Sequence, residues 1–407
     1  MLRKTWYYLH RQGLRRTLEL ILAQLRGSLR GAWYALCFFL RWPGGAKQLC
    51  ARLAGQTVLV ILPTVEWGFL FARAQQIAAE LGRREGCTAI YLTRQRTLDR
   101  VCGWEEVRPG VILANAALAG RLDRVTGGAK TVIASVFDLR SAGLLARFRH
   151  DRLVYEYVDD LHLLVSGADD FSEWERLHRS LLARADLAVA SAGRLYDQIA
   201  PYAAHALLLP NAADYDFFSA PAAPDGAVQA LRKGFSCVIG YYGALADWFD
   251  YAAVKKAARA RPDWRWVLVG SAIGPALENS GILKLPNVTW LPAAPYAALP
   301  SYLAAMDVMT IPFARNEITE AVSPVKLFEY LAAGKPVVSA DLPECRRYPP
   351  VRIYHSAAEL VERIEKSLAD RENPEALALL RQTARENTWA ARVDAELSAL
   401  GLMNKKN

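Results

Sequence analysis

A pair of opposite charges stands alone at the start of an apolar stretch, "SPVKLFEYLAAGKPVVSAD", residues 323–341. Ser323 is a good N-cap residue, and Pro324 suits the first helical position, where its missing N–H costs nothing. The pattern therefore predicts a helix followed by a buried strand. Lys326 falls in the first turn, where the helix dipole disfavours a cation. A bound diphosphate would explain the lysine, because the unpaired N–H groups of a helix start attract phosphate.

Glu329 follows Lys326 by three residues, so both side chains share one face of the expected helix. A carboxylate in this place can accept two hydrogen bonds from a sugar diol. The alternative is an i,i+3 salt bridge between the two residues, worth about 0.2–0.5 kcal/mol. The isolation of the pair on an otherwise apolar helix favours contact with a ligand.

The composition of the 407-residue chain is that of a globular protein with two domains, since 53% of residues are hydrophobic and 22% are charged. The net charge of +9 resides entirely in residues 1–55, which contain ten basic residues and one acid, Glu19. The remainder is formally neutral. This distribution indicates a local anionic partner and argues against nucleic-acid binding.

The basic segment predicts an amphipathic helix, because apolar residues such as Leu18, Leu22, Leu25 and Leu29 recur at helical spacing between arginines. Residues 1–50 are therefore expected to lie on an anionic membrane surface, to which each basic residue contributes about 1 kcal/mol. Packing on the body of the protein or on a partner is the alternative. The longest apolar run near the start has nine residues, too few to span a membrane.

The N-terminus also lacks the layout of a signal peptide. The six cysteines are scattered, which predicts neither disulfides nor structural zinc and suits a reducing compartment. We therefore expect a cytoplasmic protein that associates peripherally with the inner face of the membrane.

From residue 56 onward, short apolar runs alternate with helical stretches, as in doubly wound parallel sheets. The expected strands are 57–63, 87–92, 110–115, 131–137, 152–158, 186–191 and 206–211, then 236–244, 265–271, 287–292, 308–313, 335–340 and 352–356. We predict an α/β protein with an N-terminal extension (1–55), two Rossmann-like domains (56–215 and 235–380) that face a central cleft, and a C-terminal helix (381–403). Residues 212–234 are predicted to form the connection between the two domains. Ligands should bind beyond the carboxyl ends of the strands.

"SPVKLFEYLAAGKPVV" resembles the nucleotide-sugar signature of GT-B glycosyltransferases, in particular the retaining family-four ("group 1") enzymes. "VEWGFLFARAQQIAAELGRR", "VIGYYGALADWFDY" and "LVYEYVDD" are similar to segments of a subgroup that includes teichuronic-acid-type polysaccharide glycosyltransferases. "LLLPNAADYDFF" and "NTWAARVDAEL" resemble the exit from the first domain and the returning final helix. The resemblance covers roughly residues 56–400.

The resemblance implies that Glu329 binds the ribose hydroxyls of the donor, while the helix start with Ser323 and Lys326 holds the diphosphate. It also implies retention of anomeric configuration and no metal, because the helix dipole and lysine stabilise the leaving diphosphate in its place. Gly243 would let the backbone approach a phosphate closely, or would simply make a turn.

Two departures from the family pattern change what carries over. The family usually has a second glutamate eight positions before Glu329, where this chain has Ala321, with Glu317 and Glu320 nearby as possible substitutes. Many members also bind phosphate through an arginine and a lysine after the first strand of the second domain. Acidic residues replace them here, so phosphate charge would rest more on Arg315 and Lys326.

Other candidates follow strands of the first domain. Asp160 and His162 come after an apolar strand, where they would orient the transferred sugar or the acceptor hydroxyl; a helix cap is the alternative for the aspartate. Glu66, Trp67 and Arg73 are placed on the acceptor side, with packing of a loop on its own domain as the alternative. The D-x-D pattern at 214–216 lies in the expected connection and is not taken as a metal site, and the sequence contains no serine-nucleophile pattern or P-loop.

Together these features predict a metal-independent, cofactor-free hexosyltransferase that moves a sugar from a nucleotide-diphosphate donor to a saccharide acceptor. A lipid-linked acceptor at the membrane would give the basic segment a purpose. Two alternatives stay open: a nucleotide-sugar epimerase of the same architecture, and a non-catalytic, membrane-associated scaffold.

Overall fold

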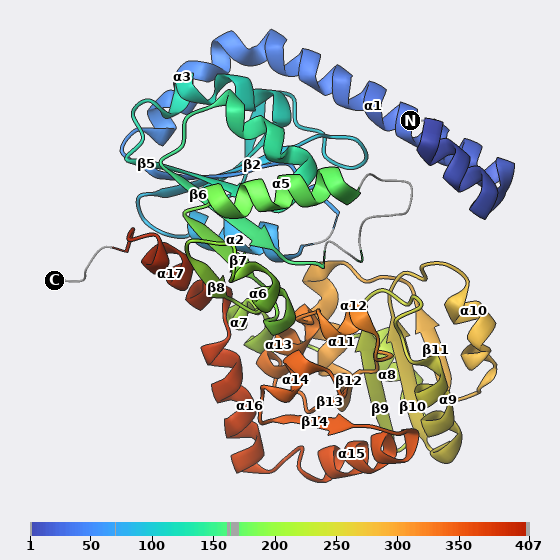
Figure 1. Ribbon diagram of the computed structural model, residues 1–407. Helices are drawn as coiled ribbons and strands as arrows, with labels where there is room; N and C mark the ends of the chain where they lie inside the picture. The colour runs from blue at the N-terminus through green and yellow to red at the C-terminus, as the bar shows by residue number, and fades with distance from the viewer. Residues whose placement is uncertain (1, 70, 161–162, 164–170, 404–407) are drawn as a thin grey trace. The chain divides into compact units, whose positions relative to one another are not determined.

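The computed structural model describes residues 2–69, 71–160, 163 and 171–403 (Figure 1). The chain forms two compact units, each built around one sheet. The first unit comprises Met1–Ser191, Leu195–Leu209 and Val393–Asn407, and the second comprises Ala192–Arg194 and Pro210–Arg392.

The first unit contains an eight-stranded sheet in the order β3-β4-β2-β1-β5-β6-β7-β8. Its strands are β1 (Thr57–Ile61), β2 (Cys87–Thr93), β3 (Trp104–Arg108), β4 (Val111–Asn115), β5 (Thr131–Val136), β6 (Arg152–Tyr157), β7 (Leu187–Ala190) and β8 (Ala206–Leu208). All neighbours pair in parallel except β3, which lies antiparallel to β4 at the edge. This edge strand was not among those expected, because the short sequence WEEVR lacks an apolar run.

Helices cover the sheet of the first unit. They are α1 (Leu2–Leu53), α2 (Arg73–Gly82), α3 (Leu122–Thr126), α5 (Phe171–Arg184), α6 (Gly193–Ile199) and α17 (Trp389–Ala399), with 3-10 helices η1 (Ala116–Arg121) and η2 (Leu139–Arg147). The central parallel strands are buried on both faces, which explains why their sequences are apolar throughout.

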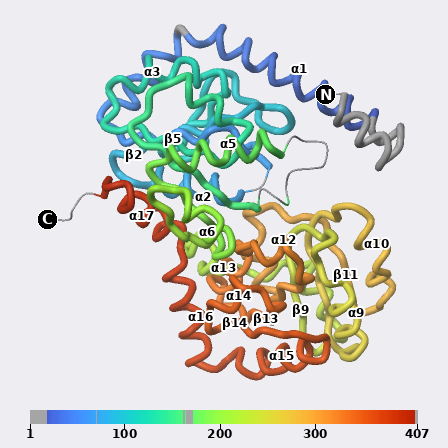
Figure 2. Tube along the Cα trace, in the orientation of Figure 1, coloured from blue at the N-terminus to red at the C-terminus, as the bar shows by residue number. Residues whose placement is uncertain are grey.

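The basic segment forms α1, a single helix of 52 residues that lies across the outside of the first unit beside α3 (Figures 1 and 2). Phe38, Leu49 and Leu53 are fully buried against the unit. The opposite face carries large apolar side chains in solvent. Across the described residues, none of the helices, α1 included, combines the length and apolar content that a bilayer span requires.

The second unit contains a six-stranded, fully parallel sheet in the order β11-β10-β9-β12-β13-β14. Its strands are β9 (Cys237–Tyr242), β10 (Trp264–Val269), β11 (Val288–Leu291), β12 (Val308–Ile311), β13 (Val337–Ala340) and β14 (Val351–Tyr354). The strand order reverses between β9 and β12, which are direct neighbours. In open α/β sheets, ligands bind at such a switch point, beyond the carboxyl ends of the strands.

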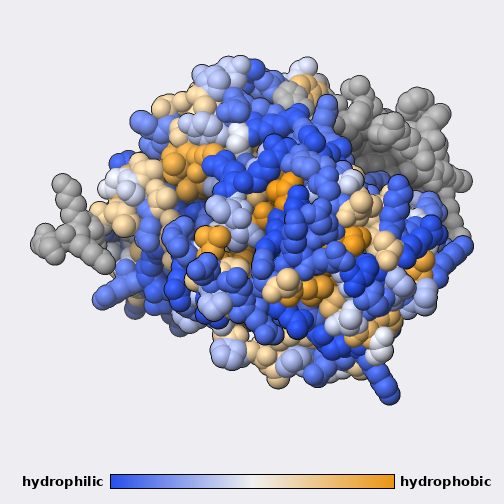
Figure 3. All heavy atoms as spheres, turned by 90° about the horizontal axis from the view of Figure 1, so that it is seen from below, coloured by the Kyte–Doolittle hydropathy of each residue, from blue (hydrophilic) through white to orange (hydrophobic). Residues whose placement is uncertain are grey.

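The helices of the second unit connect these strands. They are α7 (Tyr215–Ser219), α8 (Gly226–Leu231), α9 (Tyr251–Ala260), α10 (Ala276–Ser280), α11 (Leu299–Ala304), α12 (Glu317–Glu320), α13 (Val325–Ala332), α14 (Pro343–Arg346), α15 (Ala357–Ala369) and α16 (Pro374–Glu386), with η3 (Ile282–Lys284) and η4 (Tyr296–Ala298). The face on the side of α15 is mostly hydrophilic, with small and separate hydrophobic patches (Figure 3).

The division of the chain differs from the expected boundaries in several respects. Residues 1–55 belong to the first unit, residues 381–392 belong to the second, and α16 and α17 take the place of the single helix expected at 381–403. Residues 212–234 lie in the second unit, and the chain enters that unit at Pro210. Within this segment, the carboxylates of Asp214 and Asp225 accept hydrogen bonds from backbone N–H groups and cap α7 and α8. Asp214 and Asp225, whose presence contributed to the prediction of a connection, are therefore helix N-caps.

Candidate functional site

The Lys326–Glu329 stretch forms α13, which begins after β12 in the second unit. The residue preceding the helix is Pro324, and no side chain caps its N–H groups. The prediction that Ser323 caps the helix is therefore wrong. The Ser323 hydroxyl instead accepts a hydrogen bond from the backbone N–H of Asn211 (3.1 Å), and its carbonyl accepts one from the Asn211 side-chain amide (2.7 Å). A donor-binding role for Ser323 stays a prediction.

Glu329 is buried, with 4% of its surface exposed, and lies beside the carboxyl end of β9. The Tyr242 hydroxyl donates a hydrogen bond of 2.6 Å to Glu329 Oε2. Burial raises the pKa of Glu329 to about 7, although the Tyr242 hydrogen bond and the charge of Lys326 act to lower it. The acid is thus held in a fixed orientation and changes charge near neutrality.

The Lys326 ammonium lies over two aromatic rings, 5.0 Å from the ring centre of Phe313 and 5.5 Å from that of Tyr241. Among the described residues, no carboxylate oxygen lies within 4.0 Å of this ammonium. The salt bridge with Glu329, the alternative that the sequence left open, is therefore not formed. Burial lowers the pKa of Lys326 to about 8, against the opposing effect of the Glu329 charge.

Gly243 brings the backbone after β9 directly against Lys326. Its φ of 137° lies in the region that favours glycine. A Cβ atom at this position would lie 2.8 Å from Lys326 Cε and 3.0 Å from the Tyr241 hydroxyl. Only glycine therefore leaves room for the lysine side chain at the carboxyl end of β9.

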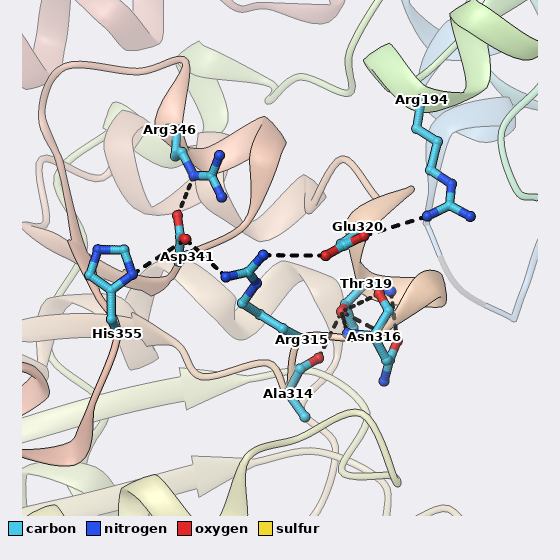
Figure 4. Close-up of polar contacts among 9 residues, drawn as sticks. All are labelled: Arg194, Ala314, Arg315, Asn316, Thr319, Glu320, Asp341, Arg346 and His355. Carbon is cyan, nitrogen blue, oxygen red and sulfur yellow. Dashed lines mark hydrogen bonds and ion pairs between the residues drawn. The ribbon is translucent and has the colours of Figure 1, made fainter.

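Arg315 and Glu320 belong to a network of charged side chains near α12 (Figure 4). The guanidinium of Arg315 lies 3.2 Å from Asp341 Oδ2 and 3.4 Å from Glu320 Oε1. The other oxygen of Glu320 lies 3.5 Å from Arg194 Nη1. Arg315 is half exposed and already bridges two carboxylates, so a bound phosphate would have to compete with them. Its phosphate-binding role and a catalytic role for Glu320 stay predictions.

Asp341 is the most heavily paired acid of this network. Besides Arg315, it contacts the guanidinium of Arg346 and, at 3.3 Å, the imidazole of His355. The hydrogen bond from Arg346 outweighs burial, so the pKa of Asp341 lies below its usual range. Sequence reasoning missed these partners, because nothing in the local pattern links residues on separate loops.

Arg73 lies on α2 in the first unit, with 5% of its surface exposed. Its Nε lies 2.9 Å from Glu156 Oε2, and its Nη1 donates a hydrogen bond of 3.0 Å to the Leu209 carbonyl. Glu396 of α17 approaches to 3.9 Å. Burial and the neighbouring Glu156 raise the pKa of Glu396 well above its ordinary value. These contacts explain why Arg73 is buried without any need for a bound sugar acceptor. Its role on the acceptor side stays a prediction.

Glu66 joins the loops that follow β1 and β2. Its carboxylate accepts hydrogen bonds from the four backbone N–H groups of residues 96–99. Burial acts to raise its pKa, but these hydrogen bonds outweigh burial and lower it. In return, Asp99 accepts hydrogen bonds of 2.9 Å from the N–H groups of Trp67 and Gly68. The two loops therefore hold each other in place.

The Trp67 ring packs edge-to-face against Phe71 and Tyr91, with ring centres 5.4 and 5.3 Å apart. These contacts match the loop-packing alternative for Glu66 and Trp67. Their role in contacting an acceptor stays a prediction.

Asp160 is buried after β6, and its Oδ2 accepts a hydrogen bond of 2.9 Å from the Gln198 side chain of α6. Gln198 in turn accepts a hydrogen bond of 2.9 Å from the Tyr157 hydroxyl. Asp160 is thus oriented by a helix that follows it by more than thirty residues in sequence. His162 lies outside the described residues.

Among the predicted donor-binding residues, the structure brings Gly243, Lys326 and Glu329 together at the switch point of the second unit. Sequence reasoning missed Tyr242 and Phe313, which complete this group. Tyr242 is the last residue of β9, and Phe313 follows the end of the neighbouring strand β12 by two residues. Aromatic residues at the ends of two strands were the signal that could have identified them. Across the described part of the chain, no three His, Cys, Asp or Glu side chains gather as metal ligands.

Residues 236–378 match the family model described as "Glycosyl transferases group 1". The matched region includes Gly243, Lys326 and Glu329 and coincides with most of the second unit. The family signature recognised in the sequence is therefore confirmed for this region.

A curated relative with a similar sequence is the teichuronic acid biosynthesis glycosyltransferase TuaH of Bacillus subtilis. It is 28% identical to this chain over 263 residues, which cover 60% of this chain and 66% of TuaH. The match thus spans slightly less than two thirds of the relative's length.

Solved structures of low sequence identity share the fold. Sucrose-phosphate synthase of Thermosynechococcus elongatus superimposes with a TM-score of 0.61 at 15% identity, covering 85% of this chain and 98% of that chain. HepE of Anabaena, in complex with UDP and glucose, gives a TM-score of 0.61 at 15% identity, covering 86% of this chain and all of HepE. These neighbours confirm the predicted GT-B fold.

Proposed function

We propose that this chain, which has the GT-B fold and carries a glycosyl transferases group 1 domain, is a glycosyltransferase that uses a nucleotide-diphosphate sugar as donor. One observation carries the proposal: at the switch point of that domain, the Lys326 ammonium has no carboxylate oxygen within 4.0 Å among the described residues, and Glu329 on the same helix is a buried acid oriented by Tyr242. The complexes of HepE with UDP and with UDP-glucose support a donor of this class.

The diphosphate of the donor binds at the start of α13, next to Lys326. When the bond between the anomeric carbon and the diphosphate oxygen breaks, the electron pair stays on that oxygen. Its growing negative charge is stabilised by the Lys326 ammonium and by N–H groups of the helix start, which no side chain caps. The ammonium is partly desolvated over Phe313 and Tyr241, which strengthens this interaction.

Glu329 binds the ribose of the donor. Its carboxylate accepts hydrogen bonds from the ribose hydroxyls, and Tyr242 fixes the orientation of the carboxylate. Because the pKa of Glu329 is about 7, the ionised form that accepts both hydrogen bonds prevails only above neutral pH. Donor affinity should therefore rise as the pH rises through 7 and fall again above about 8, where Lys326 loses its charge.

The acceptor is a saccharide of cell-surface polysaccharide biosynthesis. Its hydroxyl oxygen forms the new bond to the anomeric carbon with retention of configuration, and the hydroxyl proton passes to the leaving diphosphate. The biosynthetic role of TuaH supports this class of acceptor. A lipid-linked acceptor would be met at an anionic membrane surface. The ten basic residues within residues 1–55 and the exposed apolar side chains of α1 support such peripheral association.

The decisive experiment titrates the protein with nucleoside diphosphates and nucleotide sugars by calorimetry, and then follows nucleotide release in the presence of saccharide acceptors. We expect binding of at least one nucleotide sugar, with release that depends on acceptor. The anomeric proton signal of the product by NMR tests retention. Lys326→Met should abolish tight binding, whereas Lys256→Met, which removes an exposed lysine of α9, should not.

Two outcomes would contradict the proposal. Conversion of the sugar without transfer to an acceptor would indicate an epimerase. Failure to bind any nucleotide would indicate a non-catalytic scaffold. The scaffold has one observation in its favour, since Asp250 stands where many family members carry a phosphate-binding cation and serves as the N-cap of α9.

A further inference from the structure

A cavity of about 360 Å³ lies in the first unit between α1 and the carboxyl ends of β2 and β4. Its charged lining consists of three arginines, Arg94, Arg96 and Arg147. Small residues of α1, among them Gly31 and Ala35, form the opposite wall. The cavity therefore occupies the edge of a parallel sheet at which ligands bind.

None of the three arginines of this cavity forms an ion pair with a described residue. Among the described residues, no carboxylate oxygen lies within 4.0 Å of any of the three guanidinium groups. Arg94 donates one hydrogen bond of 3.1 Å to the Arg140 carbonyl, and burial lowers its pKa. The charge of Asp138 also acts on Arg94, but Asp138 forms its ion pair with Arg140, at 2.8 Å. The cavity therefore holds more cationic than anionic charge, and guanidinium groups match the oxygens of phosphate in geometry and charge. The composition of the wall thus favours a phosphate group.

The backbone that carries two of these arginines is held in an uncommon conformation. Gln95 has a φ of 52°, although it is not glycine, and its side chain is fully buried. Its Oε1 accepts a hydrogen bond of 2.6 Å from Asn115, and its Nε2 donates one of 2.6 Å to the Val101 carbonyl. Such conformations persist where surrounding contacts enforce them, and they cluster at ligand sites.

The helix α1 approaches this segment closely. A Cβ atom at Gly31 would lie 2.9 Å from the Arg94 carbonyl, so a larger residue would push the helix away and widen the cavity. The close approach fixes the side of α1 that carries Ala32 and Ala35 as a wall of the cavity.

A strongly apolar surface borders the same wall. Leu29, Trp33, Leu36 and Leu40 expose between 51% and 73% of their surface along one row of α1. Leu29 and Leu36 lie one helical turn from Ala32, so this exposed row adjoins the cavity along the helix. A basic cavity beside an exposed apolar row suits a molecule with an anionic head and an apolar chain.

We propose that this cavity binds the phosphate or diphosphate of a lipid-linked acceptor, while the apolar chain of that acceptor lies along Leu29, Trp33, Leu36 and Leu40. This inference rests on the proposed function and deepens it, because it assigns the class of the acceptor: an amphiphilic phosphate ester. The arginines bind the head group, and α1 supplies both the wall of the cavity and the surface for the chain.

The test measures binding of decyl phosphate, below its micelle concentration, and of inorganic pyrophosphate to the full chain by calorimetry. We expect decyl phosphate to bind more tightly than pyrophosphate. Arg147→Gln and Arg94→Gln should each weaken decyl phosphate binding by about tenfold or more, the effect of losing one charged hydrogen-bond donor. Arg149→Gln is the matched control, because it removes an exposed arginine two residues away that does not line the cavity.

A second arm tests the apolar chain. Leu36→Gln should weaken decyl phosphate binding several-fold and leave pyrophosphate binding unchanged. Equal affinities of the wild-type protein for decyl phosphate and pyrophosphate would overturn the lipid assignment in favour of a free phosphate. An equal loss in Arg149→Gln would overturn the cavity as the site, since charge alone would then explain binding.

Failure of this inference is distinguishable from failure of the proposed function. Arg147→Gln should bind nucleotide sugar as the wild type does, because Lys326 lies in the second unit. Decyl phosphate binding without nucleotide binding would leave the cavity assignment standing as a lipid-phosphate site and refute the donor site. Nucleotide binding without decyl phosphate binding would refute the cavity assignment alone.

Discussion

Each unit of the protein places a basic side chain close to a buried glutamate, but the surroundings of the two cations differ. In the first unit, Arg73 contacts Glu156 at 2.9 Å and donates a hydrogen bond to the Leu209 carbonyl. In the second unit, Lys326 contacts aromatic rings, and Glu329 takes its hydrogen bond from Tyr242. The arginine is neutralised by the protein, whereas the lysine is not.

This difference separates a structural ion pair from a ligand site. A buried charge is tolerated when an opposite charge and hydrogen bonds offset its desolvation, as at Arg73. The partly desolvated ammonium of Lys326 lowers the stability of the second unit and gains its counter-charge only from a ligand. Substitution of Arg73 should therefore lower the stability of the protein, whereas substitution of Lys326 should weaken donor binding.

The largest expected effect is on the first unit. Arg73→Met should lower the free energy of unfolding by about 3–5 kcal/mol, because it leaves Glu156 buried without a counter-charge. Denaturant unfolding measures this loss. Arg84→Met is the matched control: its ion pair with Asp394 is partly exposed, so its loss should cost about 0.2–1 kcal/mol. Similar costs for the two variants would contradict a structural role specific to Arg73.

Lys326→Met should show the reverse pattern. Donor affinity should fall by about 1.5–3 kcal/mol, the value of a charged hydrogen bond, while stability stays unchanged or rises. The pKa of Lys326 is about 8 in the folded protein against 10.5 in an unfolded chain, so the folded protein releases this proton first. Relative to Lys326→Met, the wild type should therefore gain stability as the pH rises from about 8 to 10.5.

Calorimetric titration with the nucleotide sugar and denaturant unfolding at several pH values measure the two effects of Lys326→Met. A variant that loses stability but keeps its donor affinity would place Lys326 in the same class as Arg73. The comparison between the two units would then fail.

The sequence predicted the sheets well and the side-chain partners poorly. Parallel strands such as β1 and β13 are buried on both faces, so continuous apolar runs identified them. The edge strand β3 is polar and was missed. The local pattern also gave a wrong prediction at Ser323. Its hydroxyl accepts a hydrogen bond from the Asn211 N–H and does not cap the start of α13.

Long-range partners explain the remaining misses. Tyr242 precedes Glu329 by 87 residues, and Glu156 follows Arg73 by 83. Such contacts depend on strand order, which a pattern along one sequence does not specify. Lys326 and Glu329 were predictable because both stand on one short helix with little else that is charged.

Glu329→Gln should weaken donor binding by about 1–3 kcal/mol, because a charged acceptor of two ribose hydrogen bonds is lost. The pKa of Glu329 also predicts how the stability of the wild type should change with pH. The folded pKa of about 7 exceeds the unfolded value of 4.5, so the unfolding free energy of the wild type falls as the pH rises from 4.5 to 7. The variant should lack this fall. Parallel slopes for wild type and variant would show that another group titrates.

The smallest expected effect concerns the hydroxyl that orients Glu329. Tyr242→Phe removes the hydrogen bond that stabilises the ionised carboxylate, so the pKa of Glu329 should rise further. A loss of about 1 kcal/mol corresponds to an upward shift of about 0.7 pH unit in the midpoint of donor binding. Titrations with the nucleotide sugar between pH 6 and 9 measure that midpoint.

Tyr354→Phe is the matched control for Tyr242→Phe, because it removes the hydroxyl of an equally buried tyrosine, in β14, that has no hydrogen-bond partner in the described structure. Its midpoint should equal that of the wild type. An unshifted midpoint in Tyr242→Phe would mean that the ionisation of Glu329 does not control donor binding. The acid of the second unit would then resemble Glu156 in serving the fold, and only Lys326 would distinguish the two regions.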